Sequence, residues 1–374
     1  MKVLLAAVSA GAGHLQAAAA LEEAWRERQP ADDIERLDVL DLAPRFFRKA
    51  YADAYVRLVT RAPELWGLMF DRTDRPALLQ RLTRWRRLAA RHVHARLVRH
   101  LRSWRPDAVL CTHFLPLEVL GYLKQRSRSG WRPWTACVIT DFEAHALWIE
   151  SGVDLYCVAA EETRWRLLAR GVPPESIAVT GIPISASFAR HIPTGRARRD
   201  LGLPAGLPLV LVLGGGLGMG PVGAVMRELG RAGQPFQAAV VCGRNDRLRR
   251  QLEAEAYPYP VRVLGFVGNM HEWMSAARLI VTKPGGLTSS EALAVGRPML
   301  LLEPIPGQEA ANSDFLLEHG AAVKVNRVED LSFRIEPLLG SARLAAMARA
   351  ARRIGRPRAA LAVCEAASQR LEYR

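Results

Sequence analysis

Two glycine-rich loops follow strand-like apolar runs, and each could bring backbone N–H groups close to a ligand. The first, residues 9–14 (SAGAGH), contains Gly11 and Gly13 and ends at His14, just before a helix-forming run. Glycine lets the backbone turn sharply and approach a ligand closely. A histidine near a helix N-terminus is favoured in its neutral form, because the helix dipole opposes a further positive charge. His14 could therefore take a proton from a hydroxyl group, although a capping or packing role is the alternative.

The second loop, residues 214–220 (GGGLGMG), contains five glycines in seven residues. Backbone N–H groups without side chains, at the start of a helix, form an anion site that suits a diphosphate. We expect Gly214, Gly215 and Gly216 to line that site. A turn that only needs positive φ angles would use fewer glycines.

A third group of polar residues follows the apolar run at 134–140 and includes Asp141 and His145. Both side chains could reach the same edge of a sheet as His14. An Asp–His pair there could orient a base or position a hydroxyl. The alternative is a helix-capping aspartate beside a surface histidine.

Hydroxyl, carboxylate and amide side chains follow further turns in the second half of the chain. The candidates for binding a sugar nucleotide are Gly285, Gly286, Thr288, Glu291, Gln308, Glu309 and Asn312. A carboxylate suits a ribose diol, and Gln and Glu suit sugar hydroxyls, because these groups accept directional hydrogen bonds. No DxD pair or metal-ligand spacing is present, so we expect no metal and no cofactor. Backbone N–H groups, helix dipoles and basic side chains would then meet the diphosphate charge.

The loops need strands to position them, and short apolar runs supply candidates. Buried strands are predicted at 2–8, 107–111, 134–140, 155–159, 207–213, 236–243, 261–266 and 277–283. Each half opens with a strand, a glycine loop and a helix, which predicts an α/β fold with two facing Rossmann-like domains. We expect an N-terminal domain at 1–190, a linker at 191–206 and a C-terminal domain at 207–355. A last helix at 356–374 should pack back toward the N-terminal domain.

Composition restricts the class of protein. The chain has 374 residues, 49% hydrophobic content and five dispersed cysteines, which fit a two-domain protein with reduced thiols. No run approaches a spanning helix or a signal peptide. The formal charge is +15, and most of it lies at 45–105, where 16 Lys and Arg face four acids among eight aromatic residues. This basic-aromatic segment, with a long helix expected at 75–105, suits an anionic bilayer, or is simply a solvated surface.

Seven stretches of the sequence together resemble the diacylglycerol glycosyltransferase family. That family includes monogalactosyldiacylglycerol synthases and processive diacylglycerol glucosyltransferases, and more distantly the lipid-II N-acetylglucosaminyltransferase. The resemblance runs from residue 2 to about 325. It is carried by SAGAGHLQAA, VITDFEAHALW, VDLYCVAAEET, GIPISASF, GFVGNM, TKPGGLTSSEAL and EPIPGQEAANSDFL.

The resemblance implies a GT-B fold with the active cleft between its domains, and inverting, metal-independent transfer. The donor would be UDP-glucose or UDP-galactose and the acceptor diacylglycerol or a related lipid. It implies that Gly214–Gly216 hold the diphosphate, the Phe266–Val267 backbone meets the uracil, Glu291 binds ribose, and Gln308 and Glu309 bind the hexose. His14 matches the family's base or acceptor-site histidine, and Trp148 an acceptor-side tryptophan. The protein would be cytoplasmic and peripheral on the inner face of the cell membrane.

Several readings remain open. A UDP-N-acetylglucosamine 2-epimerase would share the architecture, but the motifs argue against it. A peptidoglycan-type N-acetylglucosaminyltransferase is closer, and a UDP-sugar-binding protein without transfer activity is a further alternative. No nucleic-acid motif is present, so we expect no nucleic-acid partner. The residues do not decide between glucose and galactose, the lipid acceptor, processivity, oligomeric state, or whether His14 or Asp141 is the base.

Overall fold

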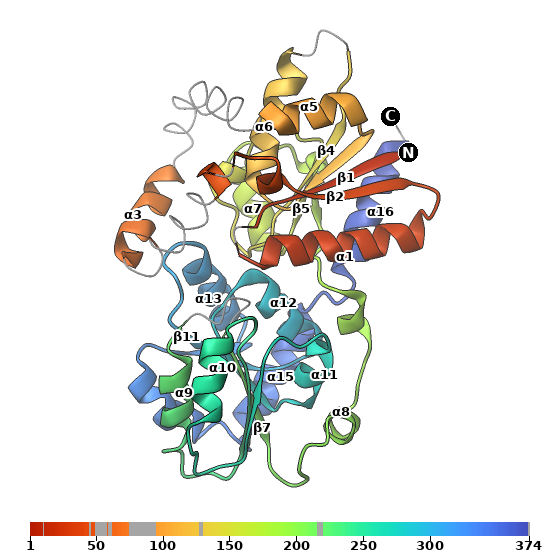
Figure 1. The fold of residues 1–374 in the computed structure, drawn as a ribbon. Helices are drawn as coiled ribbons and strands as arrows, with labels where there is room; N and C mark the ends of the chain where they lie inside the picture. Colours follow the sequence, from red (N-terminus) through yellow and green to blue (C-terminus); the bar gives the residue numbers. More distant parts are fainter. Residues whose placement is uncertain are drawn as a thin grey trace. The chain divides into compact units, whose positions relative to one another are not determined.

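The chain forms two compact units in a computed structural model (Figure 1). The structure describes residues 1–9, 11–44, 46–48, 58, 62–74, 95–126, 130–214 and 220–372. The first unit contains Met1–Ala186, Ile305–Gln308 and Arg358–Arg374, and the second contains Ser187–Pro304 and Glu309–Pro357. In the described part of the chain, no helix combines the length and apolar character needed to cross a membrane.

The first unit is built on a six-stranded parallel sheet in the order β2-β1-β3-β4-β5-β6. Its strands are β1 (Lys2–Ala7), β2 (Asp33–Asp38), β3 (Ala108–Cys111), β4 (Trp134–Val138), β5 (Leu155–Val158) and β6 (Ile177–Val179). Its α-helices are α1 (Gly13–Arg28), α3 (Pro63–Thr73), α5 (Ala95–Trp104), α6 (Phe114–Arg126), α7 (Glu161–Ala169) and α16 (Ala359–Glu372). Short 3-10 turns are η1 (Val39–Asp41), η2 (Ala146–Trp148), η3 (Pro174–Ser176) and, at the boundary of the units, η4 (Ala186–Ala189).

The second unit also contains a six-stranded parallel sheet, but its strand order differs and is β12-β11-β10-β7-β8-β9. Its strands are β7 (Leu209–Leu213), β8 (Gln237–Val241), β9 (Val261–Leu264), β10 (Leu279–Thr282), β11 (Met299–Leu302) and β12 (Ala322–Val325). Its helices are α8 (Thr194–Asp200), α9 (Val222–Leu229), α10 (Asp246–Glu253), α11 (Met270–Ala276), α12 (Gly286–Ala294), α13 (Gln308–Glu318), α14 (Leu331–Ile335) and α15 (Ala342–Ile354), with a 3-10 turn η5 (Val328–Asp330).

In both sheets the strand order reverses beside the first strand of the unit. The chain places β2 on one side of β1 and β3 on the other, and it places β8 and β10 on either side of β7. Loops that leave neighbouring strands in opposite directions open a crevice at the carboxyl ends of the strands, where open α/β sheets bind ligands. The loops after β1 and β3, and those after β7 and β10, are therefore the expected binding positions.

Each of the eight predicted apolar runs contains a strand, the edge strand β9 included, whereas the edge strands β2, β6 and β12 were not predicted. The interior strands β1, β3, β4, β5, β7 and β10 lie within the predicted runs. β2 (DIERLD) was not predicted as a strand because charged residues interrupt its apolar pattern. It is an edge strand and is at least partly exposed along its length. The segment 191–206, expected as a linker, contains α8, which packs on α11 within the second unit. Of the long helix expected at 75–105, α5 covers the last part, and 75–94 lies outside the described residues.

The last helix completes the core of the first unit. α16 packs against α1 and contributes buried Val363, Cys364 and Ala367 to the core that contains Trp25. Arg28 on α1 also pairs with Glu365 on α16 at 3.3 Å. Trp25 is fully buried, and its indole N–H donates to Asp32 at 2.9 Å. One face of the first sheet therefore depends on residues near both ends of the chain.

Candidate active site

His14 lies in the first turn of α1, immediately after the glycine loop that leaves β1. Its Nδ1 is 2.7 Å from the carbonyl oxygen of Thr112, which follows β3. A carbonyl oxygen can only accept a hydrogen bond, so Nδ1 carries the proton and Nε2 keeps its lone pair. The Thr112 hydroxyl donates to the backbone oxygen of His14 at 2.9 Å, and the Thr140 hydroxyl lies 3.1 Å from Nδ1. Neighbouring strand ends thus fix both the orientation and the tautomer of this ring.

The surroundings of His14 hold it neutral. Burial lowers the pKa of His14 below its usual value of 6.5, although the charge of Asp141 and the bond to Thr112 act in the opposite direction. A neutral imidazole with an available Nε2 has the form required of a general base. The nearby negative charge of Asp141 would stabilise the imidazolium that forms once Nε2 accepts a proton.

A second histidine, His113, lies against His14 and was not singled out from the sequence. The two ring centroids are 4.7 Å apart with the planes nearly perpendicular. Its Nδ1 accepts a hydrogen bond from the Leu115 N–H at 3.1 Å, so Nε2 carries the proton in its neutral form. Burial and the neighbouring His14 hold the pKa of His113 well below its usual range. Its position directly after β3, at the reversal of strand order, is the signal that could have revealed it.

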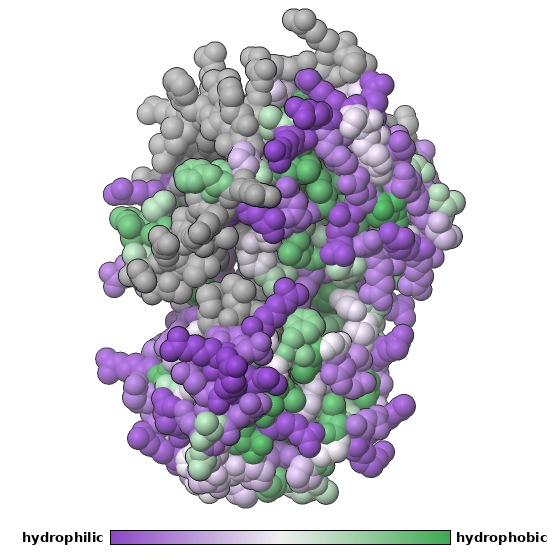
Figure 2. Space-filling model, viewed as in Figure 1, coloured by the Kyte–Doolittle hydropathy of each residue, from purple (hydrophilic) through white to green (hydrophobic). Residues whose placement is uncertain are grey.

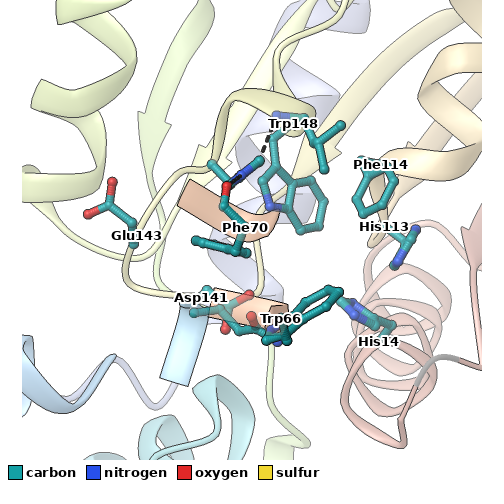
Figure 3. A pocket seen from close by; sticks show the side chains of 11 residues that line it. His14, Trp66, Phe70, His113, Phe114, Asp141, Glu143 and Trp148 are labelled. Carbon is teal, nitrogen blue, oxygen red and sulfur yellow. Dashed lines mark hydrogen bonds between the residues drawn. The ribbon is translucent and has the colours of Figure 1, made fainter. Parts of the chain in front are cut away.

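Aromatic and polar side chains surround His14 in a pocket of the first unit (Figure 3). The lining residues are His14, Trp66, Phe70, His113, Phe114, Asp141, Glu143, His145, Leu147, Trp148 and Gln308. Trp148 is buried, and its ring centroid lies 6.4 Å from that of His14 and 6.2 Å from that of His113. A pocket with apolar walls and a base at one side can hold an amphipathic molecule with its hydroxyl near Nε2.

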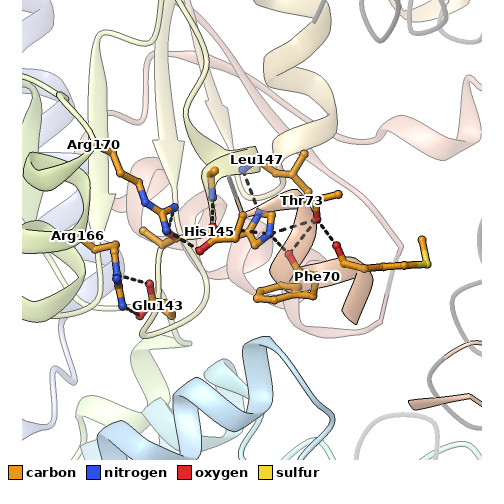
Figure 4. Close-up of polar contacts among 11 residues, drawn as sticks. Phe70, Thr73, Glu143, His145, Leu147, Arg166 and Arg170 are labelled. Atoms are coloured by element: carbon orange, nitrogen blue, oxygen red, sulfur yellow. Dashed lines mark hydrogen bonds and ion pairs between the residues drawn. The ribbon is translucent and has the colours of Figure 1, made fainter. Parts of the chain in front are cut away.

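Asp141 and His145 occupy different positions in this pocket. Asp141 lines it and acts electrostatically on His14. His145 is buried, its Nδ1 accepts from the Leu147 N–H at 3.0 Å, and its Nε2 donates to the Phe70 carbonyl at 3.0 Å (Figure 4). Nδ1 thus caps the turn that follows His145, and Nε2 holds this loop against α3. The geometry favours a structural role for His145 over the catalytic role expected from the sequence.

In the second unit, the loops after β7 and β10 approach each other as the strand order requires. Gly214 follows β7 directly, whereas Gly215 and Gly216 lie outside the described residues. Gly220, at the far end of this loop, has a φ of +111°, and a Cβ there would lie 3.2 Å from Cε of Lys283. Lys283 therefore places a cation beside the glycine loop. It is a candidate for the basic group that a diphosphate needs, and the sequence motif alone did not single it out.

Helix α12 carries the next group of predicted donor residues. Gly285 is its N-cap residue, Gly286 and Thr288 lie in its first turn, and Glu291 lies in its second turn. Burial raises the pKa of Glu291 to about 8, so the carboxyl is largely protonated at pH 7. A protonated carboxyl can donate one hydrogen bond and accept others, which suits a sugar diol.

Helix α13 fastens the loop that precedes α12. Asn312 is completely buried, and its side-chain N–H donates to the Pro284 carbonyl at 3.1 Å. Asn312 thus positions the loop between β10 and α12 and, in this structure, its amide group faces protein. Gln308 and Glu309 form the first turn of α13, and Gln308 lines the pocket that contains His14.

The loop after β9 presents an exposed aromatic ring. The Phe266 side chain is 65% exposed, and the Arg244 guanidinium lies 5.7 Å from the centre of its ring. Val267 follows it and is partly buried. The predicted contact of this segment with uracil uses the backbone, and it stays a prediction.

Comparison with known proteins identifies the family. Residues 14–184 match the family described as monogalactosyldiacylglycerol (MGDG) synthase, and residues 209–352 match the glycosyltransferase family 28 C-terminal domain. A probable chloroplastic monogalactosyldiacylglycerol synthase 2 of Oryza sativa subsp. japonica is 34% identical over 86% of this chain and 70% of its own. The chain belongs to the monogalactosyldiacylglycerol synthase family. A processive diacylglycerol beta-glucosyltransferase of Bacillus pumilus is 26% identical over 90% of this chain and 86% of its own.

Solved structures show how widely the fold of this family is shared. Acinetobacter baumannii MurG superimposes with a TM-score of 0.60 at 16% identity, covering 98% of this chain and 99% of that one. Anabaena HepE in complex with UDP superimposes with a TM-score of 0.59 at 15% identity, and the match covers 100% of this chain and 99% of that one. A putative UDP-N-acetylglucosamine 2-epimerase of Listeria monocytogenes superimposes with a TM-score of 0.64 at 16% identity, and the match covers 100% of this chain and 97% of that one. The expected GT-B fold class is confirmed, and so is the expected family, which rests on sequence.

The raised pKa of Glu291 leads to a testable dependence of stability on pH. A glutamate with its usual pKa of 4.5 when unfolded and about 8 when folded stabilises the folded state at low pH. That stability is lost as pH rises from about 5 to 8, by up to about 1.4 kcal/mol per pH unit. Glu291→Gln cannot lose a proton, so its stability relative to wild type should increase with pH across this window in urea titrations.

A matched control is Glu329→Gln, which changes an exposed carboxylate of the same unit. Its stability curve should run parallel to that of the wild type between pH 5 and 8. Parallel curves for Glu291→Gln as well would contradict a raised pKa at Glu291.

Proposed function

We propose that this protein transfers glucose or galactose from a UDP-sugar to diacylglycerol or a similar lipid. The observation that carries the proposal is the bond from His14 Nδ1 to the Thr112 carbonyl, which leaves Nε2 available as a base in an aromatic-walled pocket. The relatives named as monogalactosyldiacylglycerol synthases and diacylglycerol glucosyltransferases support the acceptor class. Those two names differ in the sugar, so both donors belong to the proposal.

The proposed reaction is an inverting displacement at the anomeric carbon. The acceptor hydroxyl attacks from the face opposite UDP, and its proton passes to Nε2 of His14. A bond from the acceptor oxygen to the anomeric carbon forms as the bond from that carbon to UDP breaks, and UDP leaves with the electron pair. Asp141 stabilises the imidazolium by its charge. If His14 is not the base, Asp141 is the alternative that the pocket offers.

The donor is proposed to bind at the reversal of strand order in the second unit. Gly214 and its neighbours offer backbone N–H groups to the diphosphate, and Lys283 offers a positive charge beside them. Glu291 would bind the ribose diol, and Gln308 and Glu309 the hexose. In this proposal the diphosphate charge is met by protein groups, without a metal.

The function is tested by following the label of the donor. Purified protein is incubated with radiolabelled UDP-glucose, UDP-galactose or UDP-N-acetylglucosamine and diacylglycerol vesicles, and the chloroform extract is chromatographed. We expect label in a glycolipid from UDP-glucose or UDP-galactose. Label found only as free sugar, or as an epimerised nucleotide sugar, would replace the proposal with hydrolysis or epimerisation. Transfer of N-acetylglucosamine alone would favour the peptidoglycan-type alternative.

The base is tested by His14→Ala. Loss of a general base typically lowers turnover by about 10²–10⁴, whereas UDP affinity measured by calorimetry should stay nearly unchanged. Because the pKa of His14 is lowered, the acid limb of the wild-type pH profile should lie below 6.5. If His14→Ala keeps more than about a tenth of the turnover, the base role passes to Asp141, and Asp141→Asn becomes the deciding variant.

A peripheral attachment to the inner face of the cell membrane completes the proposal. Three apolar side chains of α3 are exposed, namely Leu65 at 50%, Leu68 at 48% and Met69 at 46%. Figure 2 shows hydrophobic side chains at the surface in the place that α3 occupies in Figure 1. The helix lies within the basic-aromatic segment 45–105, most of which is outside the described residues. Apolar anchors among basic residues suit an anionic bilayer.

Replacing Leu65, Leu68 and Met69 together by serine should weaken binding to vesicles that contain anionic lipid by at least about tenfold. Each side chain loses roughly 1 kcal/mol of apolar burial, judged from its half-exposed state. The control is Phe333→Ser, which removes a 72% exposed ring of the second unit.

Wild-type protein should detach from anionic vesicles at 1 M salt, where the Debye length is about 3 Å. Equal sedimentation with neutral and anionic vesicles would exclude an electrostatic attachment.

A further inference from the structure

A single carboxylate, that of Asp74, joins helix α3 to the loop that forms the pocket wall. Asp74 is the C-terminal cap residue of α3. Its Oδ1 accepts a hydrogen bond from the Ala146 N–H at 2.7 Å, and its Oδ2 accepts from Nη2 of Arg170 at 2.6 Å. Ala146 begins η2, the short turn that ends at Trp148. The carboxylate therefore binds the helix to the turn that carries the buried tryptophan.

Arg170 extends this connection to a third element. It is the cap residue at the end of α7, and its Nη1 donates to the Ala144 carbonyl at 2.7 Å (Figure 4). Its side chain is 10% exposed and that of Asp74 is 30% exposed. A mostly buried guanidinium with two fixed acceptors has a defined geometry, unlike a solvated surface pair. Arg170 thus ties α7, the loop at 144–146 and α3 together.

The helix held in this way supplies two walls of the pocket. Trp66 and Phe70 project from α3 into the lining that contains His14. The Phe70 ring centroid lies 4.3 Å from that of His145, whose Nε2 bonds the Phe70 carbonyl. Two independent attachments, one through Asp74 and one through His145, therefore join the last turn of α3 to the loop.

We propose that Asp74 and Arg170 are positioning residues for the acceptor. They hold α3 so that Trp66 and Phe70 close the pocket around the molecule whose hydroxyl meets His14. The proposal rests on the proposed function for the chemistry of that molecule, a lipid with a free hydroxyl. Neither residue lies in the elements that carry the diphosphate and ribose candidates, so the pair acts on acceptor binding and not on binding of the nucleotide UDP itself.

The variant Arg170→Met tests the pair against a matched control in the same unit. Lys124 and Asp154 form a similar arrangement, with Nζ and Oδ2 2.8 Å apart and side chains 10% and 36% exposed. Lys124 also donates to the Gly152 carbonyl, and Asp154 accepts from the Thr135 N–H at 2.8 Å. Lys124→Met therefore removes a pair with the same exposure and the same kind of backbone bonds, away from the pocket.

Arg170→Met should raise the KM for diacylglycerol by about tenfold, equal to about 1.4 kcal/mol of acceptor binding. The dissociation constant for UDP, measured by calorimetry, should stay within about twofold of wild type, a change of under about 0.5 kcal/mol. Lys124→Met should change neither constant, and Arg170→Lys, which keeps the charge, should recover part of the loss. Similar rises in the acceptor KM for Arg170→Met and Lys124→Met would overturn the proposal, because the effect would then be general destabilisation.

Hydrogen exchange supplies a readout that does not depend on activity. Amide protons of residues 63–74 should exchange faster in Arg170→Met than in wild type or Lys124→Met, because the last turn of α3 loses an attachment. Unchanged exchange there would show that Arg170 does not hold the helix and would overturn the proposal. If the wild-type protein makes no glycolipid, the proposed function is wrong, but this does not decide the role of Arg170. The amide exchange of α3 still shows whether Arg170 holds this helix.

Discussion

The reversal of strand order beside the first strand of each sheet is the constraint on which both candidate sites depend. Parallel strands end at a common edge, and a reversal sends two neighbouring loops in opposite directions above that edge. In the first unit these loops hold Thr112, His113 and the glycine loop before His14. In the second they hold Gly214, Gly220 and Lys283. The two sheets differ in connectivity, but both reverse beside their first strand, and this reversal brings residues far apart in sequence to one edge of the sheet.

The chemistry of the first site follows from low polarity around two imidazoles. Aromatic rings surround His14 and His113, and burial disfavours a positive charge on either. The bond to the Thr112 carbonyl selects one tautomer, so the lone pair of His14 is set at Nε2. The same apolar walls that keep the base neutral also suit an acyl-bearing molecule. The partly apolar surroundings of His14 thus serve both the base and the proposed acceptor.

Sequence patterns located the parts of the site that have a strong local signature. A strand, a glycine loop and a helix in succession were enough to place His14, and glycine density marked the start of the second unit. His113 has no such signature, because one histidine after a short strand is informative only once the neighbours of that strand are known. His145 shows the opposite limit. It lies in the pocket as expected, yet its Nδ1 bonds the backbone of its own turn and its Nε2 bonds the Phe70 carbonyl of α3, 75 residues away in sequence. The polar edge strand β2 was not predicted for a similar reason, since its pairing with β1 is a contact between segments that are distant in sequence.

Helix α16 has a consequence for how the chain is made. Val363, Cys364 and Ala367 cover the face of the first sheet that contains Trp25, yet they are synthesised after the whole second unit. A chain emerging from the ribosome therefore carries an incomplete core in its first unit until residues 359–372 have also emerged. The second unit can close its own core earlier, while the apolar face of the first sheet stays uncovered until α16 packs on it.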